Sequence, residues 1–157
     1  MSPVGRAVSA ALCVVFLATA HGAIAAPQKL IIQTGWDNIT PAGLRANQEL
    51  VDQSPFNGVV VRLKSSVPEH KLSSYIFADD LWEESWTTSI IEDLQACNLR
   101  HATSNFLIVN ANPGSTDWFD DTAWVAVVQH WKLAARIASQ GRMRGLLFDP
   151  EPYSAPH

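Results

Sequence analysis

Four short apolar runs alternate with segments of helical periodicity along the chain. The runs predict strands at residues 29–34, 58–63, 105–110 and 145–149. Each run is almost continuously apolar, which is typical of parallel strands buried on both faces. The order of the elements is therefore βαβαβαβ, which predicts an α/β fold with a parallel sheet and right-handed crossovers.

The first two helices are predicted from their ends and their apolar stripes. Thr40 is a predicted N-cap, with Pro41 in the first turn and Leu44, Gln48 and Val51 at helical spacing after it. The stripe of the second helix consists of Trp86, Ile90, Leu94 and Cys97. This stripe predicts that the Cys97 thiol is buried as a small apolar group.

The third helix has the clearest pattern and spans about 122–140, with Asp120, Asp121 or Thr122 as its N-cap. Gly141 lies where a left-handed C-terminal cap is expected. The predicted buried face consists of Trp124, Val127, Val128, Trp131, Ala134, Ala135 and Ala138, with His130, Lys132 and Arg136 facing water.

Two architectures fit this order of elements. A doubly wound sheet usually has a glycine-rich phosphate loop after its first strand, but here Gly35 is followed by the bulky Trp36. A (β/α)₈ barrel instead places its chemistry at the carboxyl ends of the strands. All four predicted strand ends carry polar or aromatic groups, which favours the barrel: Trp36 and Asp37, Arg62 and Lys64, Asn110 and Asn112, and Asp149 and Glu151.

The chain is shorter than a complete barrel of this kind. A barrel needs about 250 residues, whereas the chain has 157 and stops just after its fourth predicted strand. We therefore expect the N-terminal half of a TIM-type barrel, about four β/α units, either truncated or completed by pairing. The open edges of such a half sheet predict self-association.

Residues 1–25 predict a signal peptide, which leaves residues 26–157 as the partial barrel domain. Arg6 gives a positive start, residues 7–20 are apolar and uncharged, and Ala23-Ile24-Ala25 is a small-x-small cleavage signal. We expect a secreted or periplasmic protein with no membrane contact after cleavage. An uncleaved membrane anchor is the alternative.

Composition excludes several other classes of function. The formal net charge is −4 and the chain has no basic run, so no nucleic-acid partner is expected. Two cysteines, one of them within the signal peptide, cannot form a disulfide framework. The histidines show no metal-ligand spacing, and no cofactor motif follows the first strand, so we expect neither a metal nor a cofactor.

Candidate chemistry is concentrated at the fourth strand end, Gly145-Leu-Leu-Phe-Asp-Pro-Glu-Pro-Tyr153. Residues two apart share a face of a strand, so Asp149 and Glu151 would both point toward the barrel mouth, with Tyr153 nearby. Two neighbouring carboxyl groups can act as a general acid and its charged partner. The predicted substrate-binding residues are Trp36, Asp37, Arg62 and Asn110. Trp82 and Trp118 also lie in predicted loops, where a ring could stack on a sugar.

This strand end resembles the strand-four motif D-G-x-D-x-D-x-E of family 18 chitinases in Gly145, Asp149 and Glu151. The resemblance implies that Glu151 is the general acid and that Asp149 orients a substrate acetamido group. Arg144 and Leu147 occupy the positions of the family's other two aspartates.

A second resemblance spans most of residues 29–153. The segments Thr34-Gly-Trp-Asp, Pro55-Phe-Asn-Gly-Val, Asp117-Trp-Phe-Asp-Asp, Leu133-Ala-Ala-Arg and Gly145-Leu-Leu-Phe-Asp-Pro-Glu are similar to uncharacterised secreted bacterial proteins with glycosidase-like barrels. Together the patterns predict a secreted glycoside-hydrolase-like protein acting on a polysaccharide. The alternatives are a non-catalytic carbohydrate-binding or surface protein and an inactive fragment of a barrel enzyme.

Overall fold

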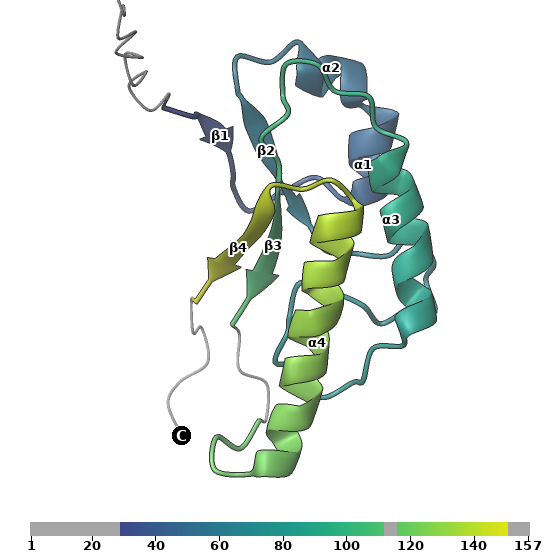
Figure 1. Cartoon of the computed structure of the whole chain (residues 1–157), viewed down its shortest axis with the longest axis vertical. Coiled ribbons are helices and arrows are strands. Elements are labelled where there is room, and N and C mark those ends of the chain that lie inside the picture. The colour runs from purple at the N-terminus through teal and green to yellow at the C-terminus, as the bar shows by residue number, and fades with distance from the viewer. Residues whose placement is uncertain (1–28, 112–115, 151–157) are drawn as a thin grey trace, which may run out of the picture.

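The computed structural model describes residues 29–111 and 116–150, which form a parallel sheet with helices in its connections (Figure 1). The elements are β1 (Ile32–Gln33), α1 (Pro41–Ala46), α2 (Gln48–Asp52), β2 (Gly58–Arg62), the 3₁₀ turn η1 (Glu84–Trp86), α3 (Thr87–Gln95), β3 (Phe106–Asn110), α4 (Asp121–Gln140) and β4 (Gly145–Asp149). The predicted α/β fold with a parallel sheet is confirmed.

The strands lie in the sequential order β1-β2-β3-β4, and every neighbouring pair is parallel. The longest pairing joins β3 to β4 and ends with Asn110 opposite Asp149. Helix α4 packs on β3 and β4, α1 packs on β2, and α3 lies between α1 and α4. These helices all cover the same face of the sheet (Figure 1).

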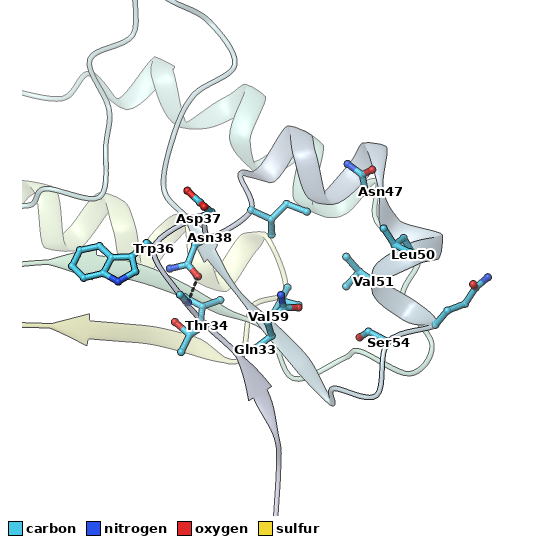
Figure 2. A pocket seen from close by; sticks show the side chains of 14 residues that line it. Gln33, Thr34, Trp36, Asp37, Asn38, Asn47, Leu50, Val51, Ser54 and Val59 are labelled. Atoms are coloured by element: carbon cyan, nitrogen blue, oxygen red, sulfur yellow. Dashed lines mark hydrogen bonds between the residues drawn. The ribbon is translucent and has the colours of Figure 1, made fainter.

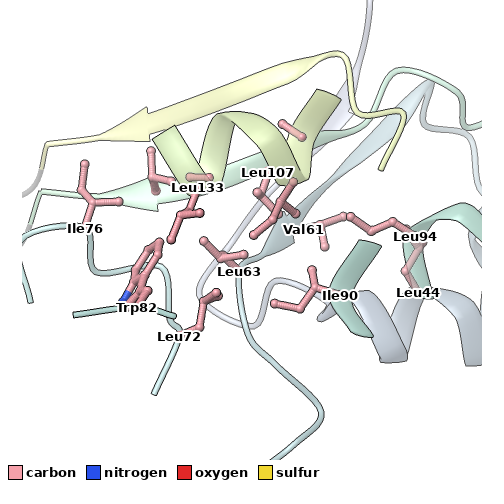
Figure 3. Close-up of a cluster of buried hydrophobic side chains, with 14 of the residues drawn as sticks. Leu44, Val61, Leu63, Leu72, Ile76, Trp82, Ile90, Leu94, Leu107 and Leu133 are labelled. Carbon is pink, nitrogen blue, oxygen red and sulfur yellow. The ribbon is translucent and has the colours of Figure 1, made fainter. Parts of the chain in front are cut away.

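The core lies between this helix layer and the sheet (Figure 3). Alternate strand residues point into the core, among them Val61 on β2 and Leu107 on β3. Leu63, which follows β2 directly, is also part of the core. The helices contribute Leu44, Ile90, Leu94, Val127, Leu133, Ala134, Ile137 and Ala138. Because the side chains of a strand alternate between its faces, Arg62, Ile108 and Asn110 lie on the face away from the helices.

The buried face of α4 differs from the predicted one. Val128 and Ala135 are exposed, while Leu133 and Ile137 take their place in the core. His130, which was expected to face water, has an exposed fraction of 0%. Its ring stacks on Trp82 at a centroid distance of 4.2 Å, and its Nδ1 donates a hydrogen bond to the Ile76 carbonyl at 2.9 Å. The segment before α3 therefore provides a partner that helical periodicity could not reveal.

Two of the predicted helix caps are confirmed and one is wrong. The Thr40 hydroxyl accepts a hydrogen bond from the Gly43 backbone N–H, and the Asp120 carboxylate accepts one from Thr122. Gly141 ends α4 with an ordinary φ of −77°. Instead, Arg142 is the left-handed residue, with a φ of 59°.

Glycine at position 141 is required by close packing. A Cβ atom there would lie 2.5 Å from Leu94 Cδ1 and 2.7 Å from the Ile137 carbonyl oxygen. The residue therefore allows the end of α4 to approach α3.

Within the described residues, no helix is long and apolar enough to cross a membrane. The predicted signal peptide, residues 1–25, lies outside the described residues.

Candidate functional site at the carboxyl ends of the strands

The end of β4 is joined to the end of β3 by backbone and side-chain hydrogen bonds. The Asn110 amide nitrogen donates to Asp149 Oδ2 at 3.1 Å, and the Ala111 backbone N–H donates to the Asp149 carbonyl at 2.9 Å. Both side chains are half-buried, and Oδ1 of Asp149 has no hydrogen-bond partner among the described residues. The Asp149 carboxylate is thus oriented by Asn110.

Trp36 lines the same cavity as Asp149. A cavity of about 340 Å³ has Thr34, Gly35 and Trp36 on one side and Ile108, Leu147, Phe148 and Asp149 on the other. The Trp36 side chain is 82% exposed and extends from the loop after β1 toward the ends of β3 and β4 (Figure 2). An aromatic ring and a carboxylate around one cavity can contact a sugar through its apolar ring face and its hydroxyl groups, respectively.

A larger cavity lies on the other side of the same loop, between β1, β2 and α2 (Figure 2). Its volume is about 900 Å³, and among the described residues that line it only Asp37 is ionisable. The loop itself is held by a hydrogen bond from the Gly35 N–H to Asn38 Oδ1, at 3.0 Å. A cavity with one carboxylate and mostly amide, hydroxyl and apolar groups is better suited to binding a ligand than to acid–base catalysis.

A segment that sequence analysis missed forms a third cavity, of about 360 Å³, beyond β2. This segment, residues 64–75, follows β2, and Ser74 fixes it to the strand ends. The Ser74 hydroxyl accepts a hydrogen bond from the Leu63 N–H at 3.0 Å, and its carbonyl accepts one from the Asn110 N–H at 2.7 Å. The segment has neither helical nor strand periodicity, so the sequence contained no signal that it would cover this edge of the sheet.

The predicted site residues are distributed over these three cavities. Asp149 and Trp36 share the small cavity, whereas Trp36 and Asp37 line the large one. Arg62 and Asn110 line the third cavity, and Asn110 is also bonded to Asp149. Two further predicted residues, Glu151 and Tyr153, lie outside the described residues.

The loop tryptophans have different environments. Trp82 is 1% exposed and stacks on His130, so the expectation that its ring could meet a sugar is wrong. Trp118 is exposed, but it packs against Phe77 and Trp124 and lines none of the three cavities. Trp36 is therefore the loop tryptophan that lies at the strand ends.

Among the described residues, Cys97 is not arranged as a catalytic nucleophile. The Cys97 thiol is half-buried and donates a hydrogen bond to the Asp93 carbonyl at 3.3 Å. Burial raises the pKa of this thiol, and the nearby Asp93 carboxylate raises it further, which disfavours the nucleophilic thiolate. In the part of the chain that the structure describes, no three histidine, cysteine or acidic side chains cluster as a metal site.

Comparison of the chain with protein-family models, curated proteins and solved structures found no match.

Proposed function

We propose that this chain is an exported, glycoside-hydrolase-like protein that acts on a polysaccharide at the carboxyl ends of its strands. Trp36 would stack on a sugar ring, Asp149 would orient the substrate, and Glu151 would act as the general acid, with Tyr153 nearby. The observation that carries the proposal is that Trp36 and Asp149 line one cavity at this edge. The resemblance of Gly145, Asp149 and Glu151 to the chitinase motif supports the division of roles.

The topology supports a barrel as the parent fold. In a doubly wound sheet the strand order reverses and helices cover both faces. Here the order is sequential and the helices cover one face, as in the first units of a (β/α)₈ barrel. We propose that the four strands form part of such a barrel and that its mouth lies at the ends of β3 and β4.

The rival function is carbohydrate binding without turnover. It is favoured by the cavity of about 900 Å³, which Trp36 and Asp37 both line and in which Asp37 is the one ionisable group among the described lining residues. A binding protein needs Trp36 and the polar groups of the loop after β1, but it does not need a proton donor at Glu151.

The two functions are separated by measuring retention on a panel of immobilised polysaccharides and, in parallel, release of reducing ends by the full chain. Trp36→Ala should weaken retention by about tenfold or more, since a buried aromatic contact contributes about 1–3 kcal/mol. Phe119→Ala is the matched control, because this ring is 98% exposed and lines none of the three cavities. Retention that is unchanged by Trp36→Ala would overturn the site assignment.

Catalysis is tested with Glu151→Gln, which removes the proton but keeps the shape of the side chain. If Glu151 is the general acid, turnover should fall by about 10²–10⁴-fold while retention is preserved. Asp149→Asn, which can still accept the hydrogen bond from Asn110, should also impair turnover. Full turnover by Glu151→Gln would exclude the acid role, whereas retention without turnover in the wild type would establish the binding function instead.

A further inference from the structure

The cavity beyond β2, here termed the basic cavity, has an unusual set of charges for an acidic chain. Its cationic residues are Arg62, Lys64 and Lys71, and no carboxylate is found among the described residues that line it. The remaining polar lining consists of Ser65, His70, Ser73, Ser74, Tyr75 and Asn110. The chain as a whole has a net charge of −4, so this local excess of positive charge does not follow from the composition.

The backbone fixes the positions of the first two cations. Arg62 and Lys64 flank Leu63, whose side chain is fully buried in the core on the helix side. Because alternate residues of an extended chain face opposite ways, Arg62 and Lys64 both point away from the core. The hydrogen bond from the Leu63 N–H to Ser74 holds the backbone between them. The two cationic side chains therefore extend from the same side of one segment.

Neither of these charges is neutralised by a described residue. Lys71 pairs with Asp80 at 2.8 Å, and the ion pairs of Arg45 and Arg136 likewise lie elsewhere. Arg62 and Lys64 form no ion pair in the part of the chain that the structure describes. Two neighbouring positive charges repel each other, so an anion placed between them would remove repulsion and gain charge-assisted hydrogen bonds.

The basic cavity adjoins the proposed catalytic site at the carboxyl ends of β3 and β4. Asn110 lines the basic cavity, and its side chain donates to Asp149, which lines the cavity of Trp36. A saccharide bound at Asp149 would thus bring a neighbouring sugar residue toward Arg62. Tyr75, which is half-exposed and forms a parallel bridge with Asn110, offers a ring and a hydroxyl group at the same place.

We infer that the basic cavity binds the carboxylate of an acidic sugar residue, so that the polysaccharide recognised by this protein contains uronic acid. The inference rests on the proposed function, because it assigns the substrate class of the same site. The planar guanidinium group of Arg62 matches a carboxylate, to which it can donate two parallel hydrogen bonds. Lys64 supplies a second positive charge to the same group.

The test measures binding of an oligogalacturonate to the full chain by titration calorimetry, with its fully methyl-esterified form as the uncharged counterpart. The acidic oligomer should bind at least about tenfold more tightly than the ester, because hydrogen bonds to an ionised carboxylate are stronger than those to a neutral ester. Arg62→Gln and Lys64→Gln should each abolish most of this difference. Lys132→Gln, an exposed α4 residue that lines none of the cavities, is the matched control and should leave the difference unchanged.

Three results would overturn the inference: equal affinity for acid and ester, a preference that survives in both Arg62→Gln and Lys64→Gln, or binding of a sulfated galactan in place of the uronate. The proposed function fails separately. Turnover of a neutral polysaccharide that is unaffected by Arg62→Gln would reject the acidic substrate and keep the hydrolase. Selective binding of oligogalacturonate without turnover of any polysaccharide would keep the basic cavity and reject catalysis.

Discussion

His130 is a polar residue in the middle of the core, and its environment is set by residues far away in the sequence. Its neighbours Trp82 and Ile76 precede it by about 50 positions, and the segment that carries them has no regular structure. Burial lowers the pKa of His130 from its ordinary value of 6.5, and the hydrogen bond to the Ile76 carbonyl opposes part of this effect. The folded protein therefore favours the neutral ring.

This preference predicts a loss of stability in mild acid. In the unfolded chain His130 takes up a proton as the pH falls below 6.5, whereas the folded chain does so only at lower pH. Its contribution is fully present above 6.5 and is lost as the pH falls toward the folded-state pKa. The free energy of unfolding should thus decrease between about pH 7.5 and about pH 5.5, a range above the titration of ordinary carboxylates.

The residue responsible is identified by comparing variants in the same denaturant titrations. His130→Gln keeps a donor for the Ile76 carbonyl but does not titrate, so its stability should change less between the two pH values than that of the wild type. His101→Gln is the matched control, because His101 is exposed and should leave the wild-type pH dependence in place. An equally steep dependence in His130→Gln would show that another group causes it.

Among the elements, α4 and three of the strands were predicted closely, whereas the connection after β2 was not predicted. The predicted runs 58–63, 105–110 and 145–149 correspond closely to β2, β3 and β4, because buried parallel strands are apolar throughout. The first run was predicted over 29–34 but pairs as a strand only at Ile32–Gln33. The predicted first helix divides at Asn47 into α1 and α2. Such limits depend on tertiary pairing, which a single sequence does not display.

The meeting of α3 and α4 at Gly141 gives a prediction about packing. In Gly141→Ala the new methyl group would overlap Leu94 Cδ1 and the Ile137 carbonyl, and the backbone carbonyl cannot move without disturbing the helix end. We expect the free energy of unfolding to fall by about 1–3 kcal/mol, as for other overpacked sites.

The control is Gly35→Ala, since a Cβ atom at Gly35 has no neighbour within 4 Å. This variant should stay within about 0.5 kcal/mol of the wild type. Equal stability of Gly141→Ala and the wild type in a denaturant titration would mean that α3 and α4 are not packed as closely as described.

At the scale of the whole molecule, the sequence predicted that polar residues would lie at the carboxyl ends of the strands. It did not predict which of these residues would line the same cavity. Asn110 and Asp149 could be expected together because adjacent parallel strands end side by side. In contrast, the sequence could not predict that Arg62 and Trp36 line different cavities, because this separation depends on the loop after β1 and on Ser74. The parallel sheet followed from the order of elements, and the expected half barrel already implied that the helices would cover one face of it.

The same architecture predicts self-association. Within the described residues, β1 and β4 each have a neighbour on one side only, so one edge of each strand carries unpaired backbone groups. Apolar side chains accompany these edges, since Ile31 is 61% exposed beside β1 and Phe148 is 46% exposed on β4. We expect the full chain to form dimers or larger species through these edges, with an average mass by light scattering that rises with protein concentration.

Association through the unpaired side of β1 can be tested by introducing one charged residue there. Ile31→Lys should shift the mass toward the monomer, because a lysine at an edge opposes pairing with a second strand and must be desolvated if pairing occurs. Val125→Lys is the matched control, since Val125 is similarly exposed but lies on helix α4 and not on or beside a strand end. A monomeric mass for the wild type at all concentrations would contradict the prediction outright. If Val125→Lys were as effective as Ile31→Lys, association would instead depend on net charge, because both variants add the same charge and only Ile31→Lys places it beside an unpaired strand.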